Sequence, residues 1–285
     1  MARRGKPARQ AVRTIAIINR KGGCGKTTTA VSLAAAFGEI GRRTLLIDLD
    51  PQGSASSWIG PGPTDDRDLF DAFVGTRELS ALAIPSRATG VDLIPASPWL
   101  VTAERTLQID LALGLIRAIQ RMPDSWDAVI VDCPPTFGYL ASSALSGCRE
   151  AIVPTEPHQL DLTGMDDALA EMDRIRVSLN PRLVLTAIVV NRMNRTNHAR
   201  GVVAGLAYRY PGLVVQPSIR DSIRVPEASA AGLPVTVHAP SSSVAADLRA
   251  VAAEIDRRDP DRPPDDAPPA HGLRQIIERL VSARG

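Results

Sequence analysis

Residues 14–41 read TIAIINRKGGCGKTTTAVSLAAAFGEIG, and this stretch decides the fold. Its first six residues are mostly apolar and predict a short buried strand. A glycine-rich turn follows. The alanine-rich run after the turn predicts a helix that stops at Gly41, because glycine is favoured just past a helix C-terminus. A strand, a tight turn and a helix in this order are typical of an α/β protein.

Further apolar segments of strand length follow along the chain, and amphipathic or alanine-rich helical stretches separate most of them. They are TLLIDLD at 44–50, VDLIPA at 91–96, DAVIVDC at 127–133, EAIVP at 150–154 and LVLTAIVV at 183–190. Strands that are apolar on both faces and alternate with helices predict a mainly parallel sheet with helices on both faces. We expect this domain to span residues 14–258.

Composition excludes several classes of protein. With 44% hydrophobic and 22% charged residues, the chain is typical of a globular domain. No apolar run approaches the ~18 residues that a membrane span needs, and no apolar signal core follows the basic N-terminus. Three scattered cysteines, Cys24, Cys133 and Cys148, form neither a disulfide framework nor a zinc motif. These features favour a reducing, cytoplasmic location.

The glycine-rich turn is a candidate phosphate site. The general phosphate-loop template, G-x-x-x-x-G-K-[ST], would need a glycine where Arg20 stands, so KGGCGKTT at 21–28 is a lysine-led variant of it. Glycines at 22, 23 and 25 let backbone N–H groups face phosphate oxygens, and the following helix adds a favourable dipole. Lys26 is expected to reach the β- and γ-phosphates and Thr27 to bind Mg²⁺. The chain has only three lysines among 33 basic residues, yet two of them, Lys21 and Lys26, lie in this loop. The turn therefore predicts a P-loop NTPase-like fold that binds Mg-ATP.

Two predicted strands end in acidic residues. Asp48 and Asp50 close one strand in LLIDLDPQG, and Asp132 closes another in VIVDCPP. Ligands of open α/β sheets bind beyond the carboxyl ends of the strands. A lone aspartate in such a place is usually a turn or cap residue, but two such strands beside a phosphate loop favour a role in the chemistry.

These three motifs together resemble the signatures of the ParA/MinD family of deviant-Walker ATPases, most of all its ParA (Soj-like) partition ATPases. Later segments resemble the same family: VPTEPHQLDLTGM at 153–165, RTN at 195–197 and IRVPEASAAGLPV at 223–235. The resemblance covers about residues 14–257. It implies a slow, Mg-dependent ATP hydrolase that is stimulated by a partner and forms a homodimer when ATP binds.

The resemblance also implies residue roles. Lys26 would bind phosphate in its own subunit, whereas Lys21 would reach the nucleotide of the opposite subunit. Asp50 would orient the attacking water, Asp48 would support the loop, and Asp132 would hold Mg²⁺ through water. The complete set expected around the nucleotide is Gly22, Gly23, Cys24, Gly25, Lys26, Thr27, Thr28 and Asp48, with Cys24 in a packing role. Where many relatives have Pro-Arg-Asn near the base, this chain has Arg220-Asp221-Ser222, which puts the family's mode of adenine recognition in question.

The charge distribution favours DNA as a partner. Between Arg174 and Arg224 there are nine arginines and one acid, a local net charge of +8, as a phosphate-contacting surface needs. A solvated basic face is the alternative. Residues 1–13 read as a basic flexible arm too short for a helix-turn-helix, so we expect non-specific binding. The resemblance points to Arg195 and Arg224 as DNA-binding residues and implies a ParB-like partner.

Beyond the domain, residues 259–270 hold five prolines and four aspartates and are expected to form an extended linker. Residues 271–285 are expected to form a short amphipathic helix. That helix is the sole support for a MinD-like, membrane-cycling alternative, so a membrane partner is not expected. A nitrogenase-reductase-like function would need cluster-binding cysteines at another spacing. The cargo of a partition ATPase stays open between a chromosome, a plasmid, an integrated element and a protein assembly.

Overall fold

The computed structural model describes residues 12–105, 113–122, 125–157 and 161–260. A seven-stranded sheet runs through the molecule in the order β3-β4-β2-β5-β1-β6-β7. The strands are β1 (Arg13–Ile17), β2 (Thr44–Asp48), β3 (Ile84–Pro85), β4 (Val91–Ile94), β5 (Ala128–Asp132), β6 (Glu150–Thr155) and β7 (Val184–Val190). All neighbours pair in parallel except β3 and β4. The expected α/β fold is confirmed. The two-residue edge strand β3 was not predicted because it is too short to have an apolar pattern.

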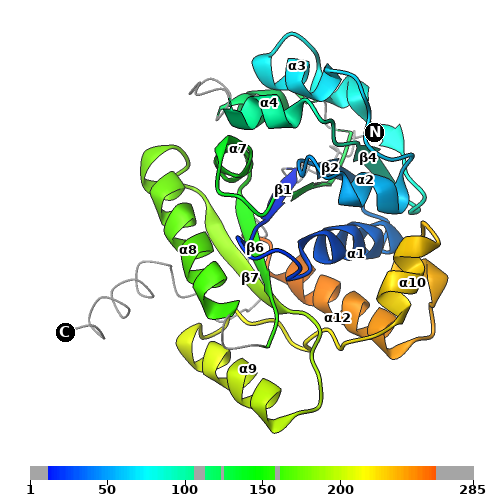
Figure 1. The fold of residues 1–285 in the computed structure, drawn as a ribbon, viewed down its shortest axis with the longest axis vertical. Helices are drawn as coiled ribbons and strands as arrows, with labels where there is room; N and C mark the ends of the chain where they lie inside the picture. The colour runs from blue at the N-terminus through cyan, green and yellow to red at the C-terminus, as the bar shows by residue number, and fades with distance from the viewer. Residues whose placement is uncertain (1–11, 106–112, 123–124, 158–160, 261–285) are drawn as a thin grey trace, which may run out of the picture.

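Helices cover both faces of the sheet (Figure 1). One face carries α1 (Lys26–Glu39), α2 (Ser54–Ile59), α10 (Arg224–Ala230), α11 (Val235–His238) and α12 (Ser243–Arg257). The other carries α3 (Asp68–Val74), η1 (Leu79–Leu82), α4 (Leu100–Arg105), α6 (Gly114–Gln120), α7 (Tyr139–Gly147), α8 (Asp161–Ser178) and α9 (Asn197–Arg209). Alternate residues of each central strand enter the two cores: Ile15 and Ile17 pack under α1, whereas Ala16 points to the opposite face. Burial on both faces explains the continuous apolar runs in the sequence.

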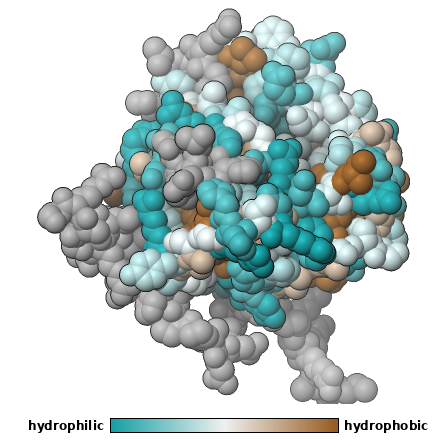
Figure 2. All heavy atoms as spheres, turned by 60° about the horizontal axis from the view of Figure 1, so that its bottom comes forward, coloured by the Kyte–Doolittle hydropathy of each residue, from teal (hydrophilic) through white to brown (hydrophobic). Residues whose placement is uncertain are grey.

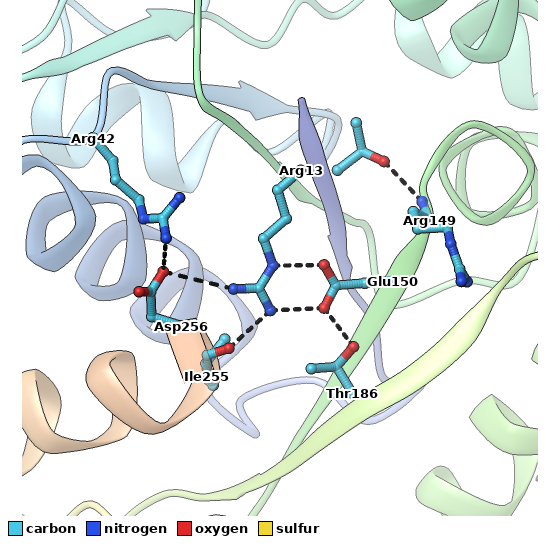
Figure 3. Close-up of polar contacts among 8 residues, drawn as sticks. Arg13, Arg42, Arg149, Glu150, Thr186, Ile255 and Asp256 are labelled. Atoms are coloured by element: carbon cyan, nitrogen blue, oxygen red, sulfur yellow. Dashed lines mark hydrogen bonds and ion pairs between the residues drawn. The ribbon is translucent and has the colours of Figure 1, made fainter. Parts of the chain in front are cut away.

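The first strand begins one residue earlier than expected, at Arg13, so the expected arm of residues 1–13 is wrong at its last residue. Arg13 is buried and forms a two-pronged ion pair with Glu150, the first residue of β6, with N–O distances of 2.6 and 2.7 Å. It also donates to the Ile255 carbonyl of α12 at 2.8 Å (Figure 3). A buried guanidinium is tolerated because it is paired. Residues 1–11, most of the expected linker and the expected C-terminal helix lie outside the described residues.

The carboxyl ends of the central strands define one edge of the sheet, and the Arg13 pair lies at the opposite edge. Ile17 of β1 and Asp48 of β2 both align with Asp132 of β5, because β5 lies between the two strands. The segment between β1 and α1 therefore emerges beside both acidic strand ends, as the sequence predicts for a ligand site.

Candidate nucleotide-binding site

The glycine-rich loop connects β1 to α1 and depends on Gly25. Its φ of 89° lies in the left-handed region that favours glycine. A Cβ atom at this position would lie only 2.5 Å from the side-chain nitrogen of Asn191. Both the backbone angle and the close approach therefore require glycine. At Gly22 and Gly23 a Cβ would meet nothing within 4 Å, so the loop is open on that side.

Asn191, just after β7, braces this loop and was not predicted. Its Nδ2 donates to the Cys24 carbonyl at 3.0 Å and to the Thr29 hydroxyl at 3.2 Å. Cys24 itself is fully buried, in agreement with a packing role. No sequence signal identifies Asn191, because it lies more than 160 residues from the atoms that it contacts.

The two loop lysines occupy different environments. Lys26 is buried at the start of α1, and its Nζ donates to the Lys21 carbonyl at 3.1 Å across the loop. The ammonium group is thus held inside the loop, where phosphate oxygens are expected. Lys21 donates its backbone N–H to Asn19 at 2.9 Å, and its Nζ lies 3.8 Å from a carboxylate oxygen of Glu156.

Asp48 is fixed by a serine that sequence reasoning missed. One Asp48 oxygen accepts the Ser56 backbone N–H at 2.8 Å and the Ser56 hydroxyl at 2.7 Å. The other accepts the Asp50 N–H at 3.2 Å. Burial raises the pKa of Asp48 to about 6, the Ser56 hydrogen bonds oppose the shift, and the charge of Asp50 adds to it. Ser56 Oγ also accepts the Ala96 N–H at 2.8 Å, which ties α2 to the loop after β4.

Asp132 is the residue best placed to bind a cation. Both of its carboxylate oxygens are buried and make no hydrogen bond of normal geometry within the described residues. Burial raises the pKa of Asp132 well above its usual range and the charge of Asp48 adds to this, while the Thr27 hydroxyl and the Lys26 ammonium act in the opposite direction. A buried carboxylate without partners is costly, so these residues fit a bound cation.

The described part of the chain contains no group of three or more His, Cys, Asp or Glu residues that could hold a metal. Mg²⁺ typically binds one or two carboxylates together with substrate phosphates and waters. The arrangement of Thr27 and Asp132 beside a phosphate loop fits this mode.

A cleft of about 660 Å³ opens next to the loop. Gly25 and Thr28 form its floor on the phosphate side, and Asn191 and Arg192 continue it. The remaining lining residues come from α2 and from the segment 219–229: Trp58, Ile219, Arg220, Asp221, Ser222, Ile223, Val225, Pro226 and Ser229. The unusual Arg220-Asp221-Ser222 thus lies in the cleft wall. Within this wall, Arg220 pairs with Asp247 of α12 at 2.5 and 2.8 Å.

Ion pairs neutralise most of the positive charge of the basic stretch 174–224. The net charge of +8 counted along the sequence therefore overstates the charge of this surface, which corrects that expectation. Six of its nine arginines form ion pairs with carboxylates outside the stretch. The pairs are Arg174–Glu171, Arg176–Asp173, Arg192–Glu156, Arg209–Asp166, Arg220–Asp247 and Arg224–Glu227. Counting along the sequence misses these acids because folding, or the next helical turn, brings them in from outside.

The two expected DNA-binding arginines differ from each other in their surroundings. Arg224 begins α10 and pairs with Glu227 at 2.6 Å. Arg195 precedes α9, is exposed, and forms no ion pair with the described residues. Figure 2 shows one face of the molecule, on which hydrophilic side chains predominate and hydrophobic ones form separate spots. Within the described ranges, no helix has the length and apolar character to cross a bilayer.

Comparisons with known proteins agree with this geometry. The model of an AAA domain family matches residues 12–185. The chromosome-partitioning ATPase Soj of Thermus thermophilus is 37% identical over 248 residues, which are 87% of this chain and 96% of Soj. The chromosome partitioning protein ParA of Caulobacter vibrioides is 33% identical over 261 residues, covering 88% and 96%.

A solved structure shows the same fold. Cobyrinic acid a,c-diamide synthase from Mycobacterium smegmatis, with bound ATP analogue and magnesium, has a TM-score of 0.75 and 31% sequence identity, and the match covers 87% of this chain and 95% of that one. The ligands in that structure are of the class expected from the sequence, ATP and Mg²⁺. Together with the loop, the paired strand-end aspartates and the matched lengths, these similarities show that the chain belongs to the ParA/MinD family of P-loop ATPases.

Proposed function

We propose that this protein is a ParA-type ATPase that dimerises on binding Mg-ATP, binds DNA without sequence preference and positions a DNA cargo together with a ParB-like partner. One observation carries the catalytic part: a loop with two lysines lies beside two aligned strand-end aspartates, of which Asp132 is buried and makes no hydrogen bond of normal geometry with the described residues. The relatives named for chromosome partitioning support the cellular part.

Different residues of the chain carry different parts of the proposed ATP hydrolysis. The loop amides and Lys26 bind the phosphates, and the cleft beside Gly25 and Thr28 receives the nucleoside. Thr27 and Asp132 hold Mg²⁺, which neutralises developing charge on the phosphates when bound. Asp50 orients the attacking water and Asp48, fixed by Ser56, supports its position.

In a dimer, each subunit contributes its Lys21 to the nucleotide site of the other subunit. In its own subunit the ammonium of Lys21 faces Glu156 rather than the inside of the loop, where Lys26 lies. A lysine with this orientation is available to a second subunit's nucleotide, and ATP bound between two subunits then acts as the link between them. Hydrolysis of ATP breaks that link, so the dimer lasts for one slow turnover. The partner stimulates hydrolysis and so shortens the lifetime of the dimer.

DNA binding is proposed to follow from dimerisation and to place the protein on the nucleoid within the cytoplasm. A dimer doubles every basic feature, including Arg195, which no carboxylate of the described residues neutralises. Each phosphate that the protein neutralises adds roughly 0.9 to the log–log salt slope of binding. Binding should therefore be ATP-dependent, independent of sequence and strongly weakened by salt.

The test compares four proteins on random duplex DNA with a non-hydrolysable ATP analogue at several salt concentrations: wild type, a deletion of residues 1–11, the double variant Arg195→Ala/Arg224→Ala, and Arg77→Ala. Arg77 matches Arg224 as an exposed arginine paired with a carboxylate at 2.6 Å, Asp68 for Arg77 and Glu227 for Arg224, and serves as the control. We expect the double variant to bind more weakly with a shallower salt slope, while Arg77→Ala binds like wild type. If the arm deletion abolishes DNA binding and the double variant leaves it unchanged, the arm makes the DNA contact instead of the two arginines.

A further inference from the structure

Three side chains link the phosphate loop to the wall of the nucleotide cleft. The Lys21 Nζ lies 3.8 Å from Glu156 Oε2, and the other oxygen of the same carboxylate, Oε1, accepts a hydrogen bond from Arg192 at 2.9 Å. Glu156 is 8% exposed at its side chain, against 35% for Lys21 and 62% for Arg192. The carboxylate is thus the buried centre of the group, and each of its oxygens faces one cation.

The backbone places these groups where the sheet meets the site. Glu156 directly follows β6, and Arg192 follows β7 by two residues. Arg192 has a φ of 50°, the one left-handed non-glycine backbone among the residues that the structure describes. A non-glycine residue held in this backbone conformation is strained, and such strain is concentrated at ligand clamps and switches. Arg192 both lines the cleft and pairs with Glu156.

We infer that Glu156 is a positioning residue that holds Lys21 in its own subunit, and that Arg192 connects this contact to the nucleotide cleft. The inference rests on the proposed function, in which Lys21 acts across a dimer. A second subunit must then compete with Glu156 for the Lys21 ammonium. A nucleotide that draws Arg192 toward the cleft moves a positive charge away from Glu156. This movement changes how strongly Glu156 holds Lys21 against a second subunit.

The competition sets a measurable threshold for dimerisation. A partly exposed ion pair contributes up to about 1 kcal/mol, which is roughly a fivefold factor for each lysine released. Two lysines are released in each dimer, so the factors multiply. Removing the charge of Glu156 should raise the dimerisation constant by up to about 25-fold, and because each dimer binds two analogue molecules, the analogue concentration at half-dimerisation should fall by up to about fivefold.

The experiment uses Glu156→Gln, which keeps the shape of the side chain and removes its charge. Dimerisation is followed by light scattering during titration with a non-hydrolysable ATP analogue and Mg²⁺. Asp167→Asn is the matched control, because Asp167 pairs at 2.9 Å with Arg20, the residue next to Lys21, and its pair is more exposed. Lys21→Ala and the double variant Lys21→Ala/Glu156→Gln complete a mutant cycle.

Glu156→Gln should dimerise at lower analogue concentration than wild type, Asp167→Asn should match wild type, and the double variant should behave like Lys21→Ala. The gain should also shrink at high salt, which screens the pair that wild type retains; a purely structural role would not produce that salt dependence. An unchanged or raised threshold in Glu156→Gln, or a gain that persists without Lys21, overturns the inference. If wild type itself stays monomeric with the analogue, the proposed function fails, which is a distinguishable result.

Discussion

At the scale of single residues, Asp48, Asp50 and Asp132 share one edge of the sheet but differ in surroundings. Asp48 accepts three hydrogen bonds, whereas Asp132 is buried and makes none of normal geometry with the described residues. Asp50 is half-buried, and its Oδ1 accepts only a local bond, from the Gln52 N–H at 3.0 Å. These differences suit three roles: a support, a water-orienting base and a magnesium ligand.

Replacing Asp50 by alanine should separate binding from hydrolysis. The variant loses the group proposed to orient water and keeps Lys26, Thr27 and Asp132, the residues proposed to bind the phosphates and the metal. We expect ATP affinity within about threefold of wild type and hydrolysis reduced at least about a hundredfold, in line with the size of general-base effects. Equilibrium binding and single-turnover hydrolysis measure the two quantities. Wild-type hydrolysis in the variant would show that Asp50 has another role.

Site residues whose neighbours are local could be proposed from the sequence. The glycines, Lys26 and Thr27 form one continuous motif, and the aspartates stand at the ends of two apolar strands: Asp48 ends β2, Asp50 follows it by two residues, and Asp132 ends β5. Residues that act at a distance could not be predicted. Asn191 braces the loop across more than 160 residues, and Ser56 ties Asp48 to the loop after β4 across a gap of 40 residues. An asparagine or serine in isolation has no periodicity or spacing that distinguishes it from a surface residue.

At the scale of secondary-structure elements, all strands except the short edge strand β3 were predicted to within about two residues, because burial on both faces makes each of them continuously apolar. The error at Arg13 has a specific cause. A charged residue next to other basic residues reads as part of a solvated arm, yet its partner Glu150 opens a strand 137 residues away. Charge alone does not distinguish a tail from a strand whose charged end is paired inside the fold.

The Arg13–Glu150 pair should stabilise the junction of β1, β6 and α12. Arg13→Met leaves Glu150 charged and buried, still contacted by the Thr186 hydroxyl at 2.5 Å but without its cation. We expect the free energy of unfolding to fall by about 3–5 kcal/mol. Arg13→Met/Glu150→Gln should recover at least half of the loss, because no unpaired charge remains. Urea denaturation measures all three proteins.

Deletion of residues 1–11 provides the control for that experiment, since it removes the other basic residues of the arm but leaves Arg13. Its free energy of unfolding should equal that of wild type. A loss below about 1 kcal/mol in Arg13→Met would show that the buried pair contributes little beyond what it costs to desolvate.

At the scale of the whole molecule, the parallel sheet separates two functions. The carboxyl ends of the strands hold the loop, the aspartates and the cleft. The amino ends are closed by Arg13, Glu150 and α12 (Figures 1 and 3). The fold also explains why counting arginines along the sequence overestimated the surface charge. Residues 174–224 belong to several elements, and arginines in them pair with carboxylates that lie outside this stretch. Surface charge is therefore a property of the fold rather than of a sequence window.

The central claim, that ATP joins two copies of this chain through Lys21, is tested most directly by the mass of the protein in light scattering. Wild type and Lys21→Ala are compared with and without a non-hydrolysable ATP analogue and Mg²⁺, and analogue binding is measured in parallel. Wild type should change from 30.4 kDa to twice that mass when the analogue is added. Lys21→Ala should bind the analogue through Lys26 and Thr27 and remain at the monomer mass. Dimerisation of Lys21→Ala at the same analogue concentration as wild type would contradict the account.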